Sequence, residues 1–346
     1  MKPKLDLVEF YISHTCNFGC SGCNRFNNFR FLGHESWHEY ADVYRQWSEK
    51  LDIGWWSILG GEPTLNKDLI HYIRGLRALW PDSHATLITN GSFQKRFDQE
   101  LYDAVKDCNI EVHIGLHNTH RRTDVITMIE KWLCHPLSIK RSPDDLNDLP
   151  GFTENWINSY NKIKSNSWPN CDNVNDWDRL PENIKKECIE YHNFSPEILS
   201  NDRKKYWISD ANNVKVSIDL ENFFVQSAMI KKPETNTFTL HNSDREKAHN
   251  NCFAKECHHM MYGKLSKCGQ SALFSEFSKQ FQVDLSDEDR ALVEAHKPCS
   301  VNDDVVAFVE NIKNSIPQCK FCPEEYVREE IFSAIDKDKF GNRINI

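Results

Sequence analysis

The sequence lacks the features of a membrane, secreted or nucleic-acid-binding protein. No apolar run approaches the roughly 20 residues needed to span a bilayer, although 39% of the residues are hydrophobic. The first residues lead directly into an apolar strand pattern, without the long apolar stretch and cleavage site of a secretion signal. The net charge of −9 disfavours nucleic-acid binding, which needs a basic surface. We therefore expect a cytoplasmic protein that binds neither membranes nor nucleic acid.

Cysteine, by contrast, is abundant, with 13 residues. The cytoplasm keeps thiols reduced, so clustered cysteines there indicate metal ligands rather than a disulfide framework. The length of 346 residues exceeds the usual size of one domain. We expect one large core that carries a second, smaller module.

Short apolar runs alternate with amphipathic helical patterns in the first third of the chain. This alternation predicts consecutive βαβ units and a parallel sheet. Ser36 and Glu39 have the spacing of a capping box, and Asn66 is expected to cap the next helix. Strands are predicted at residues 5–12, 53–59, 84–89, 110–116, 137–139 and 214–220, a fourth helix at residues 122–133, and a third helix with the buried stripe Phe93, Phe97, Leu101 and Ala104.

The pattern loosens after residue 136 into a stretch rich in Asn, Asp, Trp and Lys. Residues 142–212 are too many for a simple connection, which predicts an irregular cap or lid. Cysteine density rises again after residue 250. We therefore predict a first domain of residues 1–244 and a second of residues 245–346.

Cys16, Cys20 and Cys23 follow the first predicted strand with CxxxCxxC spacing. Soft thiolates favour iron–sulfur clusters or zinc. A cubane cluster held by three cysteines leaves one iron open to a small molecule. A zinc knuckle that lacks its fourth ligand is the alternative.

This motif, placed after the first strand of an α/β chain, resembles the signature of the radical S-adenosylmethionine (SAM) superfamily over about residues 5–140. The resemblance implies a partial (β/α)6 barrel and a [4Fe–4S] cluster whose open iron binds the methionine part of SAM. It also implies an electron donor such as flavodoxin or ferredoxin, and a 5′-deoxyadenosyl radical that removes hydrogen from a substrate carbon. The sequence departs from the family at Gly22, where an aromatic residue commonly flanks adenine; Phe18 or Phe26 is the nearest replacement.

Glycine-rich and polar turns end the later predicted strands, where the ligands of parallel barrels gather. The turn at residues 60–63 resembles the family's GGEP motif. Its glycines are expected to let the backbone approach a ligand closely, and either Glu62 or the turn carbonyls are expected to accept hydrogen bonds from the SAM ammonium group. Asn90 is expected to contact the ribose or carboxylate of SAM. An ordinary strand-to-helix turn, an Asn-Gly turn and a surface histidine are the structural alternatives. The candidate cofactor contacts are Phe18, Gly22, Gly60, Gly61, Glu62, Pro63, Thr89, Asn90 and His117.

The cysteines after residue 250 form a second set. Its spacing resembles the Twitch version of the SPASM auxiliary-cluster domain, which implies a second [4Fe–4S] cluster held by Cys252, Cys268, Cys319 and Cys322. Cys257 in place of Cys252, a ligand from His258 or His259, and a four-cysteine zinc site are the alternatives. The cysteines without metal spacing, expected to be small buried apolar residues, are Cys108, Cys134, Cys171 and Cys188.

In enzymes of this kind the auxiliary cluster often accompanies dehydrogenation. Only one strand precedes Cys16, without a leader-binding domain, which favours oxidation or epimerisation of a small metabolite or sugar over modification of a peptide or protein side chain. Lys140, Arg141 and Asp219 are candidates for substrate binding or proton transfer. The competing class is a non-catalytic iron–sulfur or zinc protein, an electron carrier or scaffold, which accounts for both cysteine sets but not for the GGEP turn.

Overall fold

The computed structural model describes residues 2–20, 23–27, 31–117, 122–133, 205–209, 214–220, 223–225, 229–232, 237–252, 255–281, 283–325 and 328–330. The chain divides into two compact units, Met1–Thr89 with Phe223–Ile346, and Asn90–Asn222. The predicted boundary near residue 245 stays a prediction. The earlier expectations that lie outside the described residues concern Gly22, Cys134, Lys140, Arg141, Cys171, Cys188, the strand at residues 137–139 and most of the lid at residues 142–212.

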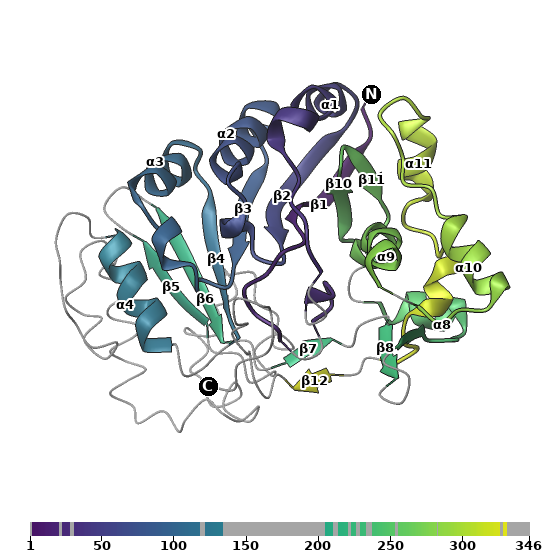
Figure 1. Ribbon diagram of the computed structural model, residues 1–346. Coiled ribbons are helices and arrows are strands. Elements are labelled where there is room, and N and C mark those ends of the chain that lie inside the picture. Colours follow the sequence, from purple (N-terminus) through teal and green to yellow (C-terminus); the bar gives the residue numbers. More distant parts are fainter. Residues whose placement is uncertain are drawn as a thin grey trace, which may run out of the picture. The chain divides into compact units, whose positions relative to one another are not determined.

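The first unit contains strands in the order β11-β10-β1-β2-β3 (Figure 1). Their bounds are β1 Lys4–Ser13, β2 Asp52–Gly60, β3 His84–Thr89, β10 His258–Met261 and β11 Lys264–Ser266. β1 pairs in parallel with β2 and β10, and β2 pairs in parallel with β3, whereas β11 runs antiparallel to β10. Sequence patterns did not predict β10, because its four residues include two histidines and show no apolar alternation.

Apolar side chains cover both faces of β1, as a central parallel strand requires. The ring of Phe10 lies 5.5 Å from that of Tyr44 in α1 (Trp37–Lys50) and 5.6 Å from that of Trp80, which follows α2 (Leu69–Leu79). Tyr11 points to the opposite face, where it joins a buried cluster with Leu273 and Phe277 of α9 (Gly269–Gln280). The N-terminal strand is therefore buried between helices from both ends of the chain.

The predicted capping box at the start of α1 is wrong. Ser36 is the N-cap residue, but its side chain does not cap the helix. Its hydroxyl donates to Asp68 Oδ2 at 3.0 Å, and the same oxygen accepts the first backbone N–H of α1 at 3.1 Å. A carboxylate 32 residues away thus replaces the local partner Glu39.

Asn66 also differs from its predicted role. Asp68, not Asn66, is the N-cap residue of α2. The Asn66 amide donates to the backbone oxygens of Ile12 at 2.7 Å and Glu35 at 2.8 Å. Asn66 therefore ties the β2–α2 connection to both ends of the loop that follows β1, instead of capping a helix.

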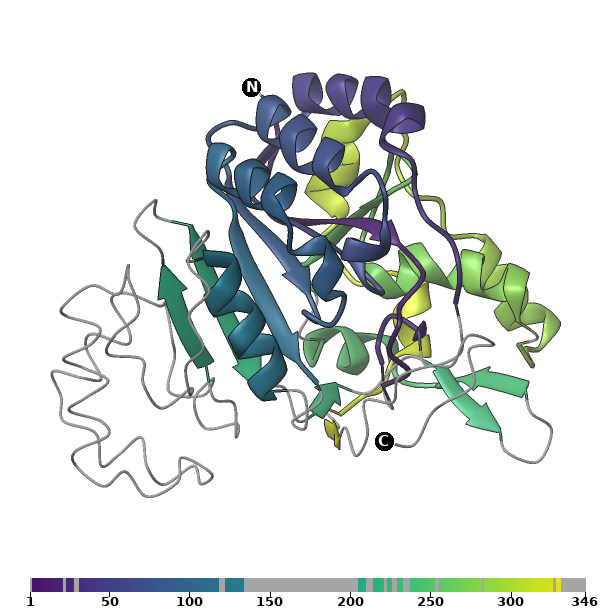
Figure 2. The same cartoon turned by 60° about the vertical axis from the view of Figure 1, so that its left-hand side comes forward.

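The second unit contains β4 (Glu111–Leu116), parallel to β6 (Lys215–Leu220), which is antiparallel to β5 (Lys205–Ser209); its helices are α3 (Gln99–Asp107) and α4 (Arg122–Leu133) (Figure 2). α3 starts later than predicted, because Asp98 caps it by accepting the N–H of Leu101 at 2.9 Å. Phe93 and Phe97 precede the helix, whereas Leu101 and Ala104 lie on its buried face as predicted. The parallel strands and intervening helices of both units confirm the predicted α/β fold class.

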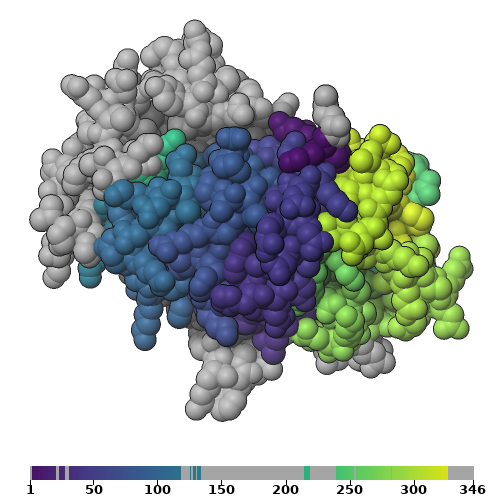
Figure 3. Space-filling view, turned by 90° about the horizontal axis from the view of Figure 1, so that it is seen from above, coloured from purple at the N-terminus to yellow at the C-terminus, as the bar shows by residue number. Residues whose placement is uncertain are grey.

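The C-terminal part of the first unit consists of short elements. They are α8 Arg245–Asn250, α10 Asp287–Glu294, α11 Val305–Asn311, the 3-10 helix η7 Pro317–Phe321, and two strand pairs, β7 (Phe223–Val225) with β12 (Arg328–Glu330) and β8 (Met229–Lys232) with β9 (Thr237–Leu240). Figure 3 shows α1 beside the yellow C-terminal segment. Lys50, the last residue of α1, donates a hydrogen bond from Nζ to Val301 O in that segment at 2.7 Å. Within the described residues, no helix has the length and apolar character needed to cross a membrane.

A buried carboxylate joins three parts of the first unit. Glu35 accepts hydrogen bonds from the hydroxyls of Tyr44 in α1 and Tyr72 in α2, and from the backbone N–H of Tyr262 between β10 and β11. Burial raises the pKa of Glu35 to about 7, although these three hydrogen bonds act in the opposite direction. The carboxyl group is therefore partly protonated near neutral pH.

We expect Glu35 to make the stability of the chain depend on pH. Its pKa rises from an ordinary 4.5 to about 7 on folding, so its stabilising contribution is complete below pH 4.5 and is lost as the pH rises through 7. The free energy of unfolding of wild type should fall by up to about 3 kcal/mol across this window relative to Glu35→Gln. Urea unfolding of the reduced apo chain at several pH values measures this difference.

The matched control is Glu49→Gln, which changes an exposed carboxylate near the other end of α1. Its pH profile should follow that of wild type. A Glu35→Gln profile parallel to the wild-type profile from pH 4.5 to 8 would contradict the assignment.

Candidate metal and ligand site

The loop after β1 carries the first three cysteines, and both of its ends are fixed. His14, where the loop leaves β1, donates its backbone N–H to the oxygen of Gly33, where the loop returns, at 2.8 Å. The N–H of Glu35 donates to Ile12 O at 2.9 Å. Cys16 and the other two cysteines of the motif therefore lie in a loop that is closed at its base.

The three predicted ligands of the first motif gather around Phe18. Phe18 and Cys20 are buried together, and Cys16 and Cys23 pack against them. The N–H of Phe18 lies 3.3 Å from the Cys16 sulfur. None of the ten cysteines within the described residues forms a disulfide, so their sulfur atoms suit a metal group.

The glycine turn that ends β2 packs directly on this loop. The N–H groups of Gly61 and Glu62 donate to Ser13 O (2.6 Å) and Thr15 O (2.9 Å). A Cβ atom on Gly60 would lie 2.3 Å from Ser13 O, and one on Gly61 would lie 2.6 Å from Thr15 O. The glycines thus permit close approach of backbone to backbone, immediately before Cys16, where the sequence had suggested close approach to a ligand.

Glu62 is fully buried, and its carboxylate holds the turn together. Oε1 accepts hydrogen bonds from the N–H of Thr64 at 3.0 Å, from the Thr64 hydroxyl at 2.5 Å and from the Thr89 hydroxyl at 2.6 Å. Pro63 begins the short 3-10 helix η2 (Pro63–Leu65) that follows. Thr89 therefore meets the GGEP turn at the ends of β2 and β3, as strand-end placement predicted.

Two other predicted cofactor contacts belong to the second unit. Asn90 is buried, and its Oδ1 accepts the N–H of Ser92 at 2.9 Å as well as the Ser92 hydroxyl. Gly91 adopts a φ of 65°, which favours glycine. His117 directly follows β4. Asp219, a candidate for substrate binding, lies in β6 of the same unit.

Of the two aromatic residues considered for adenine, Phe18 lies among the cysteines. Phe26 is fully buried in the core instead, with its ring 5.2 Å from that of Phe277 in α9. Asn27, which sequence reasoning missed, accepts a hydrogen bond from the Cys23 thiol at 3.7 Å and donates to His14 O. An Asn four residues past a cysteine motif carries no signal that would have identified it.

The second cysteine set converges because short elements hold each thiol. Cys268 is the N-cap residue of α9, while Cys319 lies in η7 and Cys322 ends it. Cys252 follows α8, and Ser243, just before α8, donates its backbone N–H to Lys320 O of η7 at 2.8 Å. Burial, followed by the neighbouring Cys268, Cys252 and Cys319, raises the pKa of the Cys322 thiol. The structure thus brings together the four residues predicted from spacing.

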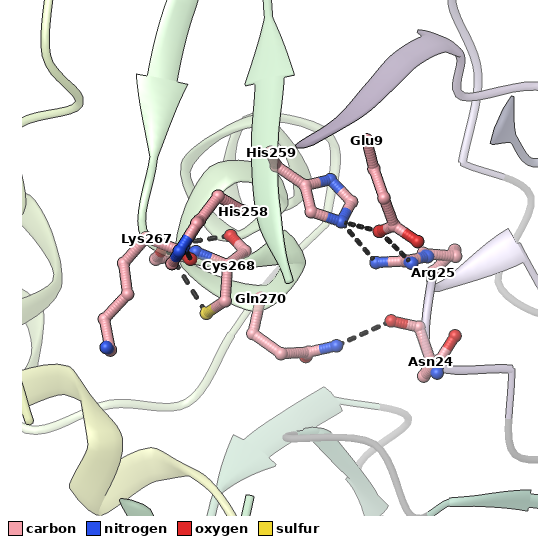
Figure 4. A network of polar contacts seen from close by, with 9 residues as sticks. Glu9, Asn24, Arg25, His258, His259, Lys267, Cys268 and Gln270 are labelled. Atoms are coloured by element: carbon pink, nitrogen blue, oxygen red, sulfur yellow. Dashed lines mark hydrogen bonds and ion pairs between the residues drawn. The ribbon is translucent and has the colours of Figure 1, made fainter. Parts of the chain in front are cut away.

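Cys257 lies beside this group but has other partners. Burial raises the pKa of its thiol, and the neighbouring Glu9 and Cys268 raise it further, whereas the Arg25 guanidinium lowers it. His258 and His259, also considered as ligands, are engaged elsewhere: His258 Nδ1 is 2.7 Å from Lys267 O, and His259 contacts Glu9. The buried polar group of Glu9, Arg25 and His259 next to the cysteines was not predicted, because its members are far apart in the sequence (Figure 4).

A cavity of about 180 Å³ opens between the cysteines of the second set. Three buried polar atoms of its lining residues have no hydrogen-bond partner within the described part of the chain: His249 Nε2, Gln270 Oε1 and His296 Nε2. Buried polar groups without partners are costly. Cysteines outside disulfides, empty volume and unpartnered polar atoms together fit a group of several atoms that supplies its own hydrogen-bond partners.

Neither cysteine set is gathered as tightly as a single metal ion requires. A tetrahedral zinc ion binds each thiolate at about 2.3 Å, which brings the sulfur atoms within roughly 4 Å of one another. Where the structure describes the chain, the groups whose ligand atoms all lie within 4.8 Å are Glu9 with Cys257 and His259, and His38 with Asp68 and His71. The wider spacing of both cysteine sets fits iron–sulfur clusters better than single zinc ions.

Comparison with known proteins agrees with this chemistry. Residues 10–142 match the sequence model described as the Radical SAM superfamily. A GTP 3′,8-cyclase of Nautilia profundicola is 32% identical over 103 residues, which are 29% of this chain and 32% of that protein. A GTP 3′,8-cyclase of Aliarcobacter butzleri is 28% identical over 133 residues, 38% of this chain and 41% of that protein. The match thus spans about a third to two fifths of the length of these relatives.

Solved structures similar to the chain include SuiB of Streptococcus suis bound to S-adenosylmethionine, with a TM-score of 0.41, 13% identity, and coverage of 92% of this chain and 72% of that one. BtrN in complex with AdoMet and 2-DOIA has a TM-score of 0.27 and 21% identity, with coverage of 34% of this chain and 47% of that one.

Proposed function

We propose that this chain removes a hydrogen atom from a carbon of a small-molecule substrate, because residues 10–142 match the radical SAM superfamily, whose members use a [4Fe–4S] cluster and SAM. The bound cofactors supply the 5′-deoxyadenosyl radical that takes the hydrogen atom. Oxidation or epimerisation of a metabolite or sugar is the proposed outcome. An electron donor such as flavodoxin or ferredoxin supplies the electron that cleaves SAM.

Cys16, Cys20 and Cys23 are the proposed ligands of the SAM cluster. The observation that carries this proposal is the contact between the GGEP turn and the cysteine loop, made by the hydrogen bonds of Gly61 and Glu62 to the backbone just before Cys16. That contact supports a SAM-binding role for the turn beside the three cysteines, a role that an electron carrier or a zinc scaffold does not need.

The backbone of the GGEP turn, rather than the Glu62 carboxylate, is the proposed acceptor for the SAM ammonium group. Glu62 is fully buried and its Oε1 already accepts three hydrogen bonds. The carboxylate therefore positions the turn, and Thr89 helps to hold it. Phe18 is the proposed packing surface for adenine, because Phe26 is committed to the core against α9.

A second [4Fe–4S] cluster is the proposed occupant of the cavity between Cys252, Cys268, Cys319 and Cys322. Cys252 is preferred to Cys257 because Cys322 has Cys252, Cys268 and Cys319 as its charged neighbours, whereas Cys257, which also lines the cavity, is hydrogen-bonded to Glu9. Such a cluster can take up the electron that a substrate radical loses on oxidation, while a proton leaves the substrate. Oxidation of the substrate therefore fits a protein with two cluster sites.

The substrate is proposed to be a small molecule, in part because the curated relatives are named for a reaction of GTP. The match to them covers about a third of this chain, so the identity of the substrate does not follow from it. Candidate metabolites and sugars deuterated at single carbons identify the substrate directly, because the correct one transfers deuterium to 5′-deoxyadenosine.

Cys16→Ala should abolish the formation of 5′-deoxyadenosine, because the SAM cluster would lose a ligand. The protein is purified without oxygen, loaded with iron and sulfide, and incubated with SAM and dithionite. Cys108→Ala, which removes a buried thiol at the end of α3, is the matched control and should retain activity. Equal amounts of 5′-deoxyadenosine from wild type and Cys16→Ala would refute the enzymatic proposal.

Replacing Cys319 and Cys322 together with Ala should halve the iron content, from about eight to about four atoms per chain, because two of four ligands of one cubane are removed. Cys257→Ala should leave the iron content unchanged. Iron and zinc are measured by elemental analysis of the anaerobic protein. About four iron atoms and one zinc ion in wild type would refute the auxiliary cluster and leave the SAM cluster in place.

A further inference from the structure

A buried charged network lies between the two cysteine sites. Arg25 follows Cys23 by two residues, and its Nη2 atom donates to Glu9 Oε2 at 2.7 Å, while Nη1 lies 2.9 Å from His259 Nε2. His259 Nε2 also contacts Glu9 Oε2. Figure 4 shows the three side chains converging, with Cys268 nearby. The guanidinium group thus links the first cysteine loop to both β1 and β10.

The parallel pairing of β1 with β10 sets up this network. Glu9 and His259 are direct partners across the two strands, so their side chains project on the same side at the same level. Both are almost fully buried, at 8% and 0% exposure. Although burial acts in the other direction, Arg25 and His259 hold the pKa of Glu9 well below its usual range. Glu9 is therefore a carboxylate that depends on Arg25 for its balancing charge.

The other side of Arg25 meets the start of α9, which carries Cys268. A Cβ atom on Gly269 would lie only 2.1 Å from Arg25 Nη1 and 2.9 Å from His259 Nε2. One residue further, Gln270 Nε2 donates to Asn24 O at 2.6 Å. The segment after Cys23 and the segment after Cys268 are therefore in contact at two consecutive positions.

Glu9, Cys257 and His259 also offer ligand atoms within 4.8 Å of one another, which by residue type would suit a zinc ion. Arg25, however, already bonds to two of these three side chains. A dication in the same place would be repelled strongly by the guanidinium in this poorly solvated setting. The arginine thus takes the place of a metal ion as the cation of this group.

We propose that Arg25 is a positioning residue that couples the structure of one cysteine site to that of the other; this proposal rests on the function proposed above. It fixes the loop that carries Cys23 against the helix start that carries Cys268. The retention and the electronic environment of the metal group in the second site therefore depend on a residue from the first loop, even when the first cluster is absent.

The test uses the full chain with Cys16, Cys20 and Cys23 replaced by Ala, so that only the second site holds iron. Arg25→Gln and Gly269→Ala are made singly and together, and the release of iron to a chelator is timed. Each single change should speed the release by about tenfold, the factor expected when a charge-assisted hydrogen bond is lost. Both together should be no faster than either alone, because they break the same contact.

Two further variants separate this role from a general effect on folding. Arg45→Gln, which removes an exposed ion pair with Asp42 on α1, should release iron at the wild-type rate. Arg25→Lys keeps the charge but has no planar fork to reach both Glu9 and His259, so it should release iron as fast as Arg25→Gln. The electron paramagnetic resonance spectrum of the reduced second cluster should shift in Arg25→Gln and stay unchanged in Arg45→Gln.

The proposal would be overturned if the effects of Arg25→Gln and Gly269→Ala on the rate of iron release multiplied. It would also be overturned if Arg25→Gln released iron at the same rate as Arg45→Gln. A zinc ion that is lost in Cys257→Ala would overturn it as well. Zinc found between Cys252, Cys268, Cys319 and Cys322 would instead refute the auxiliary cluster, and the same comparison made on zinc release would still decide whether Arg25 joins the sites.

Discussion

The parallel pairing of β1 with β10 is the contact on which the arrangement of the first unit depends. It joins the first strand of the chain to a four-residue strand some 250 positions later, with Glu9 opposite His259. Because side chains alternate between the faces of a strand, a slip of one residue would move His259 to the other face. Arg25 would then lose one of its two partners, and the start of α9 would lose its place beside the first cysteine loop.

Close backbone contact supports the same region from the other side. Gly60 and Gly61 let the end of β2 pack on the segment that leads to Cys16, and Glu62 and Thr89 hold that turn with buried hydrogen bonds. The cost of burying these polar groups is offset only while each has its partner. The cysteine loop is thus held between a rigid turn and a buried ion pair, which suits a site that must position a reactive cofactor.

Several polar residues serve the tertiary structure instead of the local element in which they were predicted to act. Ser36 bonds to Asp68 rather than forming a capping box, and Asn66 bonds to two distant carbonyl groups. Phe93 and Phe97 fit a helical stripe by spacing, but Asp98 provides a better start for α3. Local patterns predicted that helices would occur here, and long-range hydrogen bonds decided where they begin and what caps them.

The sequence by itself determined the α/β class and the order of the first strands and helices, and it predicted both cysteine sets, because these depend on periodicity and on spacing along one segment. The comparison with the radical SAM superfamily supports the first set. Only the tertiary structure decided that Cys252, Cys268, Cys319 and Cys322 lie together and that Cys257, beside them, is paired with Glu9. It alone decided that Arg25 would join the two sites. Such choices depend on which distant side chains share a buried space, and no local pattern records the pairing of β1 with β10.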